Sequence, residues 1–329
     1  MEQEQVTLIP NETELIGEAE PKKIISVHNP RREIWAVGGG KGGVGKTLIT
    51  VNLGVSLAAQ GFRVLLVDLD FGSANLHTCL GVGAQNRTLS DFLEGKYSKI
   101  GRVISPTGIE NLWIINGAKD SLTVANLSFL LKQKLLDRLK KLHFDYILFD
   151  LGAGTNFNTI DFFLAADKMI LSLSPEPTSV ENAYRFVKSA FYRRLNTKAQ
   201  EMHVADLIAE GMKKIGNNPL KSPVALIEEI RKIDKENGEM FFALLNDFRP
   251  KLIVNMARCE GDAEIGFGIR SIFHKYWGIE LDYLGALEYD NYVWQSVRKR
   301  RPLLIEFPHS SLGINLDRIA RVLANERDR

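Results

Sequence analysis

Residues 40–47 read GKGGVGKT, and this stretch constrains the fold of the chain more than any other. A glycine, four variable residues, then glycine, lysine and threonine form the pattern of a phosphate-binding loop. The apolar run IWAV precedes the loop, and LITVNLGVSLAAQ, a segment suited to a helix, follows it up to Gly61. This order predicts a strand, a glycine-rich turn and a helix whose N-terminus holds an anion, because the helix dipole favours negative charge there.

Individual residues of this loop have predictable roles. Its glycines let successive backbone N–H groups converge on phosphate oxygens. We expect Lys46 to reach the β- and γ-phosphates and the Thr47 hydroxyl to coordinate Mg²⁺. Lys41 is not required by such a loop, but its position suits a cation that reaches the phosphates of a second subunit. The predicted nucleotide-binding residues of this stretch are Gly40, Lys41, Gly42, Gly43, Val44, Gly45, Lys46, Thr47 and Leu48.

From Ile34 onward, short apolar runs alternate with helix-length stretches such as 47–60 and 128–142. Apolar strands that alternate with helices indicate an α/β fold, in which a doubly wound, mainly parallel sheet is covered by helices on both faces. The expected strands are residues 34–37, 64–68, 112–115, 146–149, 169–173, 252–254 and 283–287.

Two stretches depart from this alternation. Residues 1–33 are polar and contain three prolines, which predicts a flexible N-terminal arm before a P-loop domain at 34–329. Residues 197–249 contain three helix-like segments and no strand signal, which predicts a helical insertion. Extra helices on the flank of the sheet are the simpler interpretation of this insertion, and a partner-binding subdomain is the alternative.

Composition excludes several classes of protein. The formal net charge of +2 gives no broad reason to expect nucleic acid. Cys79 and Cys259 are the only cysteines and lie far apart, which argues against a disulfide framework or a cysteine-ligated metal within one chain. No run of 18 uncharged apolar residues predicts a membrane span, and the acidic N-terminus is unlike a signal peptide. We therefore expect a cytoplasmic protein.

Three aspartates lie at the C-terminal ends of two predicted strands. Asp68 and Asp70 come at the end of VLLVDLD, and Asp150 follows YILF. The carboxyl ends of parallel strands face the ligand crevice of a doubly wound sheet, so all three are expected near the phosphates. Asp150 fits the role of the carboxylate that holds Mg²⁺ directly or through water.

KGGVGKT, VLLVDLD at 64–70 and YILFDLGAG at 146–154 occur in the order and approximate spacing of the MinD/ParA family of deviant Walker ATPases. The chain resembles this family over residues 34–325. The resemblance implies slow, partner-stimulated hydrolysis of ATP with Mg²⁺ and a homodimer in the ATP state. It implies that Lys41, Lys46 and Asp70 are catalytic, with Asp70 positioning the attacking water. It implies a metal site of Thr47, Asp68 and Asp150.

Other parts of the family pattern match less completely. FGSANLH resembles the first switch, and Asn75 matches its asparagine although Ala74 stands where a basic residue is frequent. LGAG resembles the second switch, with Gly152 in place of a proline. Asn255, in LIVNMAR, resembles the residue that contacts adenine, and an ordinary turn residue is the alternative interpretation. GALEYDN occupies the place of the loop over the base, with Leu287 in place of a proline.

The stretch 150–195 resembles the MinD-like branch of flagellar-number regulators called FlhG or FleN. This resemblance implies a molecular switch that controls an unidentified protein partner in cellular positioning, such as flagellar number or placement, or in cell division. A binding module with little turnover and a ParA-like DNA-partitioning ATPase are the alternatives. Nothing beyond the run RKRR at 298–301 suggests a DNA face, so nucleic acid is not indicated.

The last predicted helix, 314–325, has an apolar face with the spacing of a core helix, and only four residues follow it. A separate membrane-binding helix is therefore not expected. Weak or indirect recruitment to the cytoplasmic face of the membrane, through this helix or through RKRR, stays open.

Overall fold

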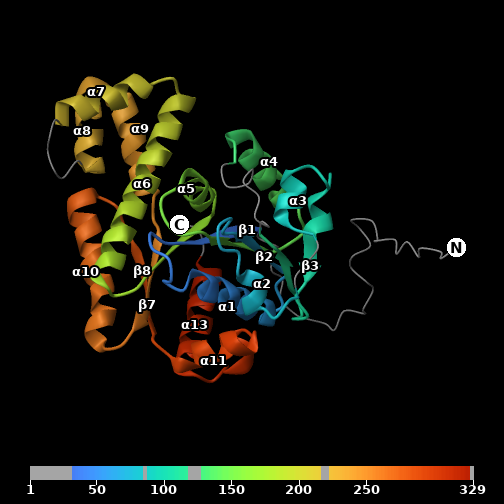
Figure 1. Cartoon of the computed structure of the whole chain (residues 1–329). Helices are drawn as coiled ribbons and strands as arrows, with labels where there is room; N and C mark the ends of the chain where they lie inside the picture. Colours follow the sequence, from blue (N-terminus) through green and yellow to red (C-terminus); the bar gives the residue numbers. More distant parts are fainter. Residues whose placement is uncertain (1–31, 84–86, 118–126, 216–221, 327–329) are drawn as a thin grey trace. The chain divides into compact units, whose positions relative to one another are not determined.

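The computed structural model describes residues 32–83, 87–117, 127–215 and 222–326. The predicted N-terminal arm lies outside the described residues, apart from its last two positions. The described part of the chain forms an eight-stranded sheet in the order β3-β4-β2-β5-β1-β6-β7-β8 (Figure 1). All strand pairs are parallel except β3 with β4. The strands are β1 (Glu33–Gly38), β2 (Val64–Leu69), β3 (Ile104–Pro106), β4 (Leu112–Ile115), β5 (Tyr146–Leu151), β6 (Lys168–Leu173), β7 (Lys251–Ala257) and β8 (Asp282–Glu288).

Successive residues of a strand point to opposite faces of the sheet, and both faces of this sheet are buried. Along β1, for example, Trp35 and Val37 belong to one buried cluster, while Ile34 and Ala36 belong to the other. Helices cover both faces, which explains why most strand positions are apolar rather than alternating with polar residues.

On one face, α1 (Lys46–Ala59) packs against the central strands and against α13 (Ser311–Asn325). Near them lie α2 (Leu76–Cys79), α11 (Asn291–Lys299) and α12 (Leu303–Glu306) (Figure 1). The other cluster receives α3 (Leu89–Leu93), η1 (Ile100–Val103), α4 (Phe129–Lys140), α5 (Phe157–Leu164), α6 (Pro177–Glu201) and α10 (Glu260–Trp277). Among the helices of the described residues, none combines the length and the hydropathy that a membrane span requires.

Between β6 and β7 the described chain forms only helices. The long helix α6 is followed by α7 (Ala205–Ile215), α8 (Pro223–Ile233) and α9 (Lys235–Asn246). These three helices pack together beside the C-terminal half of α6 (Figure 1). Each shorter helix presents an apolar side to the group, with Ile208, Leu226 and Phe241 buried between them. The role of these helices as an insertion with its own function stays a prediction.

The α/β class and the mainly parallel sheet are confirmed, and all seven predicted strands are present within three residues of their expected limits. One strand of the eight, β3, is not predicted from the sequence. It is three residues long, it ends in Pro106 and it lies at the sheet edge, so it carries almost none of the apolar pattern by which strands are recognised.

Asp161 on α5 joins three helices through one carboxylate. It accepts hydrogen bonds from Lys132 of α4, whose side chain is only 6% exposed, and from Arg193 of α6, at 2.7 Å from Nε. Removing one partner of such a pair leaves the other charge buried without compensation.

We predict that Asp161→Asn lowers the free energy of unfolding by about 2–4 kcal/mol, because Lys132 then loses its counterion. Urea denaturation followed by circular dichroism measures this. Asp137→Asn, on the exposed side of α4, is the control and should change stability by less than about 0.5 kcal/mol. Equal effects of the two substitutions would contradict this account of Asp161.

Candidate functional site

The predicted site residues come together at the carboxyl ends of three adjacent strands. The glycine-rich loop follows β1, Asp68 and Asp70 lie at the end of β2, and Asp150 lies near the end of β5. β5 is paired with both β1 and β2, and Asp68 is directly opposite Asp150 in the register. The parallel topology therefore places three separate sequence motifs side by side.

Two side chains from neighbouring strands hold the glycine-rich loop. The Ser172 hydroxyl and the Asn255 amide both donate to the carbonyl of Val44, each at 2.9 Å. Gly45 has φ +85°, and a Cβ there would lie 2.1 Å from Nδ2 of Asn255. Glycine is therefore needed at this position both for the backbone conformation and for the close approach.

Asn255 lies within β7 and is only 2% exposed. The sequence interpretation put it just past a strand and left an ordinary turn residue as the alternative. The structure removes that alternative and gives Asn255 a contact with the phosphate-binding loop. Its contact with adenine stays a prediction.

Lys46 begins α1 and is 7% exposed. Its Nζ lies 3.5 Å from the carbonyl oxygen of Lys41, so the side chain runs back along the loop. Burial lowers the pKa of Lys46, and the nearby carboxylates of Asp150 and Asp70 oppose that shift. A buried ammonium that faces carboxylates at a helix N-terminus is well placed to meet a polyphosphate.

The Thr47 hydroxyl donates to Oδ2 of Asp150 at 2.7 Å, and Thr50 donates to Oδ1 at 3.3 Å. Burial raises the pKa of Asp150 to about 7, against the lowering effects of the Thr47 hydrogen bond and of Lys46. A divalent cation at this point would hold the carboxylate in its ionised form.

Asp68 is fully buried and accepts two backbone hydrogen bonds, from Asp70 and Leu76, both at 3.1 Å. Burial, followed by the charge of Asp150, raises the pKa of Asp68 well above its ordinary value. Its two bonds span the segment between the end of β2 and the start of α2, which includes the predicted first switch. Asp68 therefore anchors both ends of that segment.

Asp70 is partly exposed, and its Oδ1 accepts from the N–H groups of Gly72 and Ser73 at 3.2 and 3.0 Å. Asn75 is exposed and stands at the N-cap position of α2 without a capping hydrogen bond from its side chain, and Leu48 is partly buried in the first turn of α1. A Cβ on Gly152 would lie 3.2 Å from Oδ1 of Asp70. Gly152 of the predicted second switch therefore lies close to the Asp70 carboxylate, which also bonds to the start of the predicted first switch.

Lys41 does not point to open solvent. Its Nζ donates to the Glu176 carboxylate at 2.6 Å and to the Thr178 hydroxyl at 3.1 Å. Both partners belong to SPEPT, directly after β6, and the sequence interpretation missed them. A polar segment at the carboxyl end of an apolar strand was the signal that could have pointed to them.

The residues present fit a magnesium ion better than a metal with a full set of protein ligands. No group of three or more His, Cys, Asp or Glu side chains that could hold a metal occurs in the described ranges. Mg²⁺ commonly takes one or two protein oxygens and completes its shell with water and phosphate. The adjacent oxygens of Thr47 and Asp150 supply such a pair.

Basic side chains of the run 298–301 interact with neighbouring residues of the same chain. Arg298 stacks on Trp294, and both Lys299 and Arg301 pair with Glu306 of α12. These contacts tie α11 to α12 on the face that also carries α1 and α13.

A protein-family match covers the part of the chain that forms this site. The AAA domain family matches residues 32–201, about half of the chain, and these residues contain the loop, Asp68, Asp70 and Asp150. The chain belongs to the MinD/ParA family.

Two curated relatives that match most of the chain support the predicted FleN/FlhG branch of that family. Antiactivator FleN of Pseudomonas aeruginosa is 25% identical over 293 residues, covering 88% of this chain and 85% of its own length. The flagellum site-determining protein YlxH of Helicobacter pylori is 28% identical over 302 residues, covering 88% and 81%. Among solved structures, the septum site-determining protein MinD of Pyrococcus horikoshii, complexed with Mg-ADP, has a TM-score of 0.61 at 24% identity, covering 89% of this chain and 96% of its own.

The two lysines of the loop should be separable by experiment. We predict that Lys46→Ala weakens ATP binding about 100-fold, since a buried ammonium that bonds to phosphate is lost. Lys41→Ala should leave the ATP affinity of the monomer within about threefold, because Lys41 bonds to Glu176 and Thr178. Isothermal titration with Mg·ATP measures both, and a loss of affinity in Lys41→Ala as large as in Lys46→Ala would contradict these roles.

Proposed function

We propose that this protein is an ATP-driven molecular switch that binds Mg·ATP in the loop 40–47 and hydrolyses it slowly. The observation that carries the proposal is the hydrogen bond between Thr47 and Asp150 beside the buried Lys46. It brings a hydroxyl, a carboxylate and an ammonium to the N-terminus of one helix. The complex of Pyrococcus horikoshii MinD with Mg-ADP supports the choice of cofactor.

Asp70 is the residue that we assign to the attacking water. Transfer of the γ-phosphoryl group needs little covalent help from the protein and depends on positioning and on charge stabilisation. Asp70 lies at the end of the strand next to that of Asp150, is partly exposed, and interacts electrostatically with Lys46. A carboxylate there can orient water against the phosphate that Lys46 holds.

Lys41 supports an ATP-dependent homodimer. Its bond to Glu176 joins side chains that are 36% and 62% exposed, and ion pairs with such exposure contribute only about 0–1 kcal/mol. Charge-assisted bonds to a triphosphate are stronger, so Lys41 can leave Glu176 when a second subunit presents its nucleotide. Glu176 and Thr178 would then hold Lys41 in the monomer and release it in the dimer.

The cellular role follows from the relatives. FleN and YlxH carry names that refer to flagella, and we propose that this chain likewise controls a protein partner in flagellar number or placement. The helices α7, α8 and α9 are the candidate surface for that partner, because they extend from α6 away from the nucleotide loop (Figure 1).

We predict that Asp70→Ala still binds ATP, loses at least about tenfold in phosphate release and accumulates as a dimer. Without a group to orient water, the ATP state persists. Sedimentation velocity with Mg·ATP and a phosphate-release assay measure these effects, and Asp137→Ala is the control. A variant at Asp70 that contains bound ATP and stays monomeric would refute the dimer.

Glu176→Gln tests whether the contact with Lys41 opposes dimer formation. We predict a dimer dissociation constant up to about fivefold lower with a non-hydrolysable ATP analogue, because an exposed ion pair is worth no more than about 1 kcal/mol. Glu181→Gln is a matched control, since Glu181 is also 62% exposed, also lies at the start of α6 and also pairs with a cation. Weaker dimer formation in Glu176→Gln alone would show that Glu176 instead supports the dimer.

A further inference from the structure

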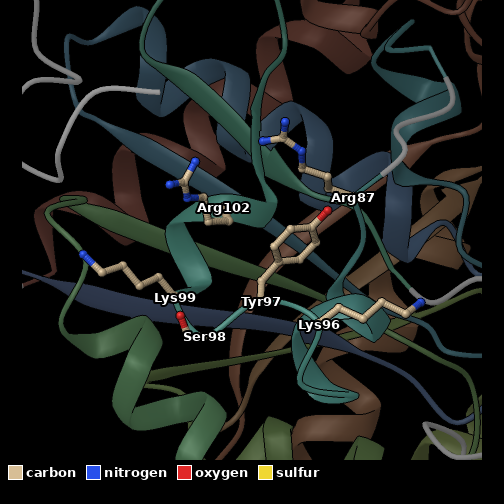
Figure 2. Close-up of a pocket in the computed structure, with 6 residues that line it drawn as sticks. All are labelled: Arg87, Lys96, Tyr97, Ser98, Lys99 and Arg102. Carbon is tan, nitrogen blue, oxygen red and sulfur yellow. The ribbon is translucent and has the colours of Figure 1, made fainter. Parts of the chain in front are cut away.

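A pocket of about 420 Å³ opens beside the antiparallel edge of the sheet, where η1 leads into β3. Three strands separate β3 from β1, so this pocket is distinct from the phosphate-binding loop. Its lining comes from one short segment around α3 and η1. We call it the basic pocket, and its residues are Arg87, Lys96, Tyr97, Ser98, Lys99 and Arg102 (Figure 2).

The charges that line the basic pocket are all positive. Lys96 is paired with Asp91 at 2.7 Å and with Glu94 at 3.3 Å, which neutralises its charge locally. Arg87 and Arg102 are both exposed, and neither forms an ion pair with a carboxylate of the described residues. Among the described residues, the guanidinium groups of Arg87 and Arg102 therefore line the same pocket without a carboxylate counterion.

Packing against the apolar core holds the Tyr97 ring of the basic pocket in place. Its side chain is partly buried and packs against the main apolar cluster. Arg87 lies beyond the hydroxyl end of the ring and Arg102 lies to one side of the ring, whereas the amino groups of Lys96 and Lys99 point away from it (Figure 2). The hydroxyl groups of Tyr97 and Ser98, which also line the pocket, are neutral hydrogen-bond donors.

We propose that the basic pocket binds a small organic molecule with two or more phosphate groups. Arginine pairs with phosphate through two parallel N–H bonds, so two arginines can hold two phosphates. The volume lies within the range of small-molecule sites, and the anchored ring gives the carbon skeleton a surface to contact.

The shape favours a small ligand over nucleic acid or membrane. Duplex DNA and anionic lipid present extended arrays of charge, which are matched by basic stripes or polybasic segments along a surface. Here the two arginines, unpaired within the described ranges, line one pocket together with the Tyr97 ring, and Lys96 is already held by Asp91 and Glu94.

Isothermal titration of the full-length protein tests the proposal. The nucleotide loop is first saturated with Mg·ADP, so that phosphate compounds cannot bind there. The probes are fructose 1,6-bisphosphate, inositol hexakisphosphate and 2,3-bisphosphoglycerate, each to about 1 mM. We expect at least one of them to bind, and the double substitution R87Q/R102Q to weaken that binding at least about tenfold.

The control is R270Q/K275Q, which removes the same charge from the exposed side of α10 and should leave the affinity unchanged. Both double variants should keep the wild-type melting temperature, because the four side chains are exposed. The proposal is overturned if none of the three probes binds, or if R87Q/R102Q binds them as the wild type does. It is also overturned if R87Q/R102Q weakens binding only to random duplex DNA or to phosphatidylserine vesicles.

Discussion

The hydrogen bond between Thr47 and Asp150 is the contact on which the rest of the site depends. It connects the first turn of α1 to the carboxyl end of β5 and fixes how the glycine-rich loop lies over the sheet. Thr50, one turn further along α1, bonds to the other oxygen of the same carboxylate. Ser172 and Asn255 hold the loop from the opposite side through Val44. Side chains of three strands, β5, β6 and β7, thus position one loop.

The site also concentrates buried charge. Asp68 and Asp150 are paired across β2 and β5, and burial raises the pKa of both carboxyl groups. Lys46 supplies one positive charge close by. Buried like charges are unfavourable unless cations or hydrogen bonds offset them, which makes the arrangement suited to a divalent cation and its phosphates. Because Asp68 also anchors both ends of the first switch, occupancy of the site can be transmitted to a segment near the surface.

Much of this could be predicted from the sequence, because the decisive signals are local. KGGVGKT and the apolar strands before each aspartate fix the loop, the strand ends and the parallel sheet. The contacts of Lys41 with Glu176 and of Asn255 with Val44 could not be predicted, since they join residues more than a hundred positions apart. β3 and the basic pocket depend on tertiary packing around one sheet edge, for which the sequence carries no periodic pattern.

The central claim is that the state of the nucleotide decides whether one chain or two form the site. Sedimentation velocity of the wild-type protein with saturating Mg·ADP, and then with a non-hydrolysable Mg·ATP analogue, measures this most directly. The account predicts a monomer with ADP and a dimer with the analogue, and it predicts that Lys41→Ala prevents the dimer. The same sedimentation coefficient with both nucleotides, at concentrations where both are bound, would contradict it.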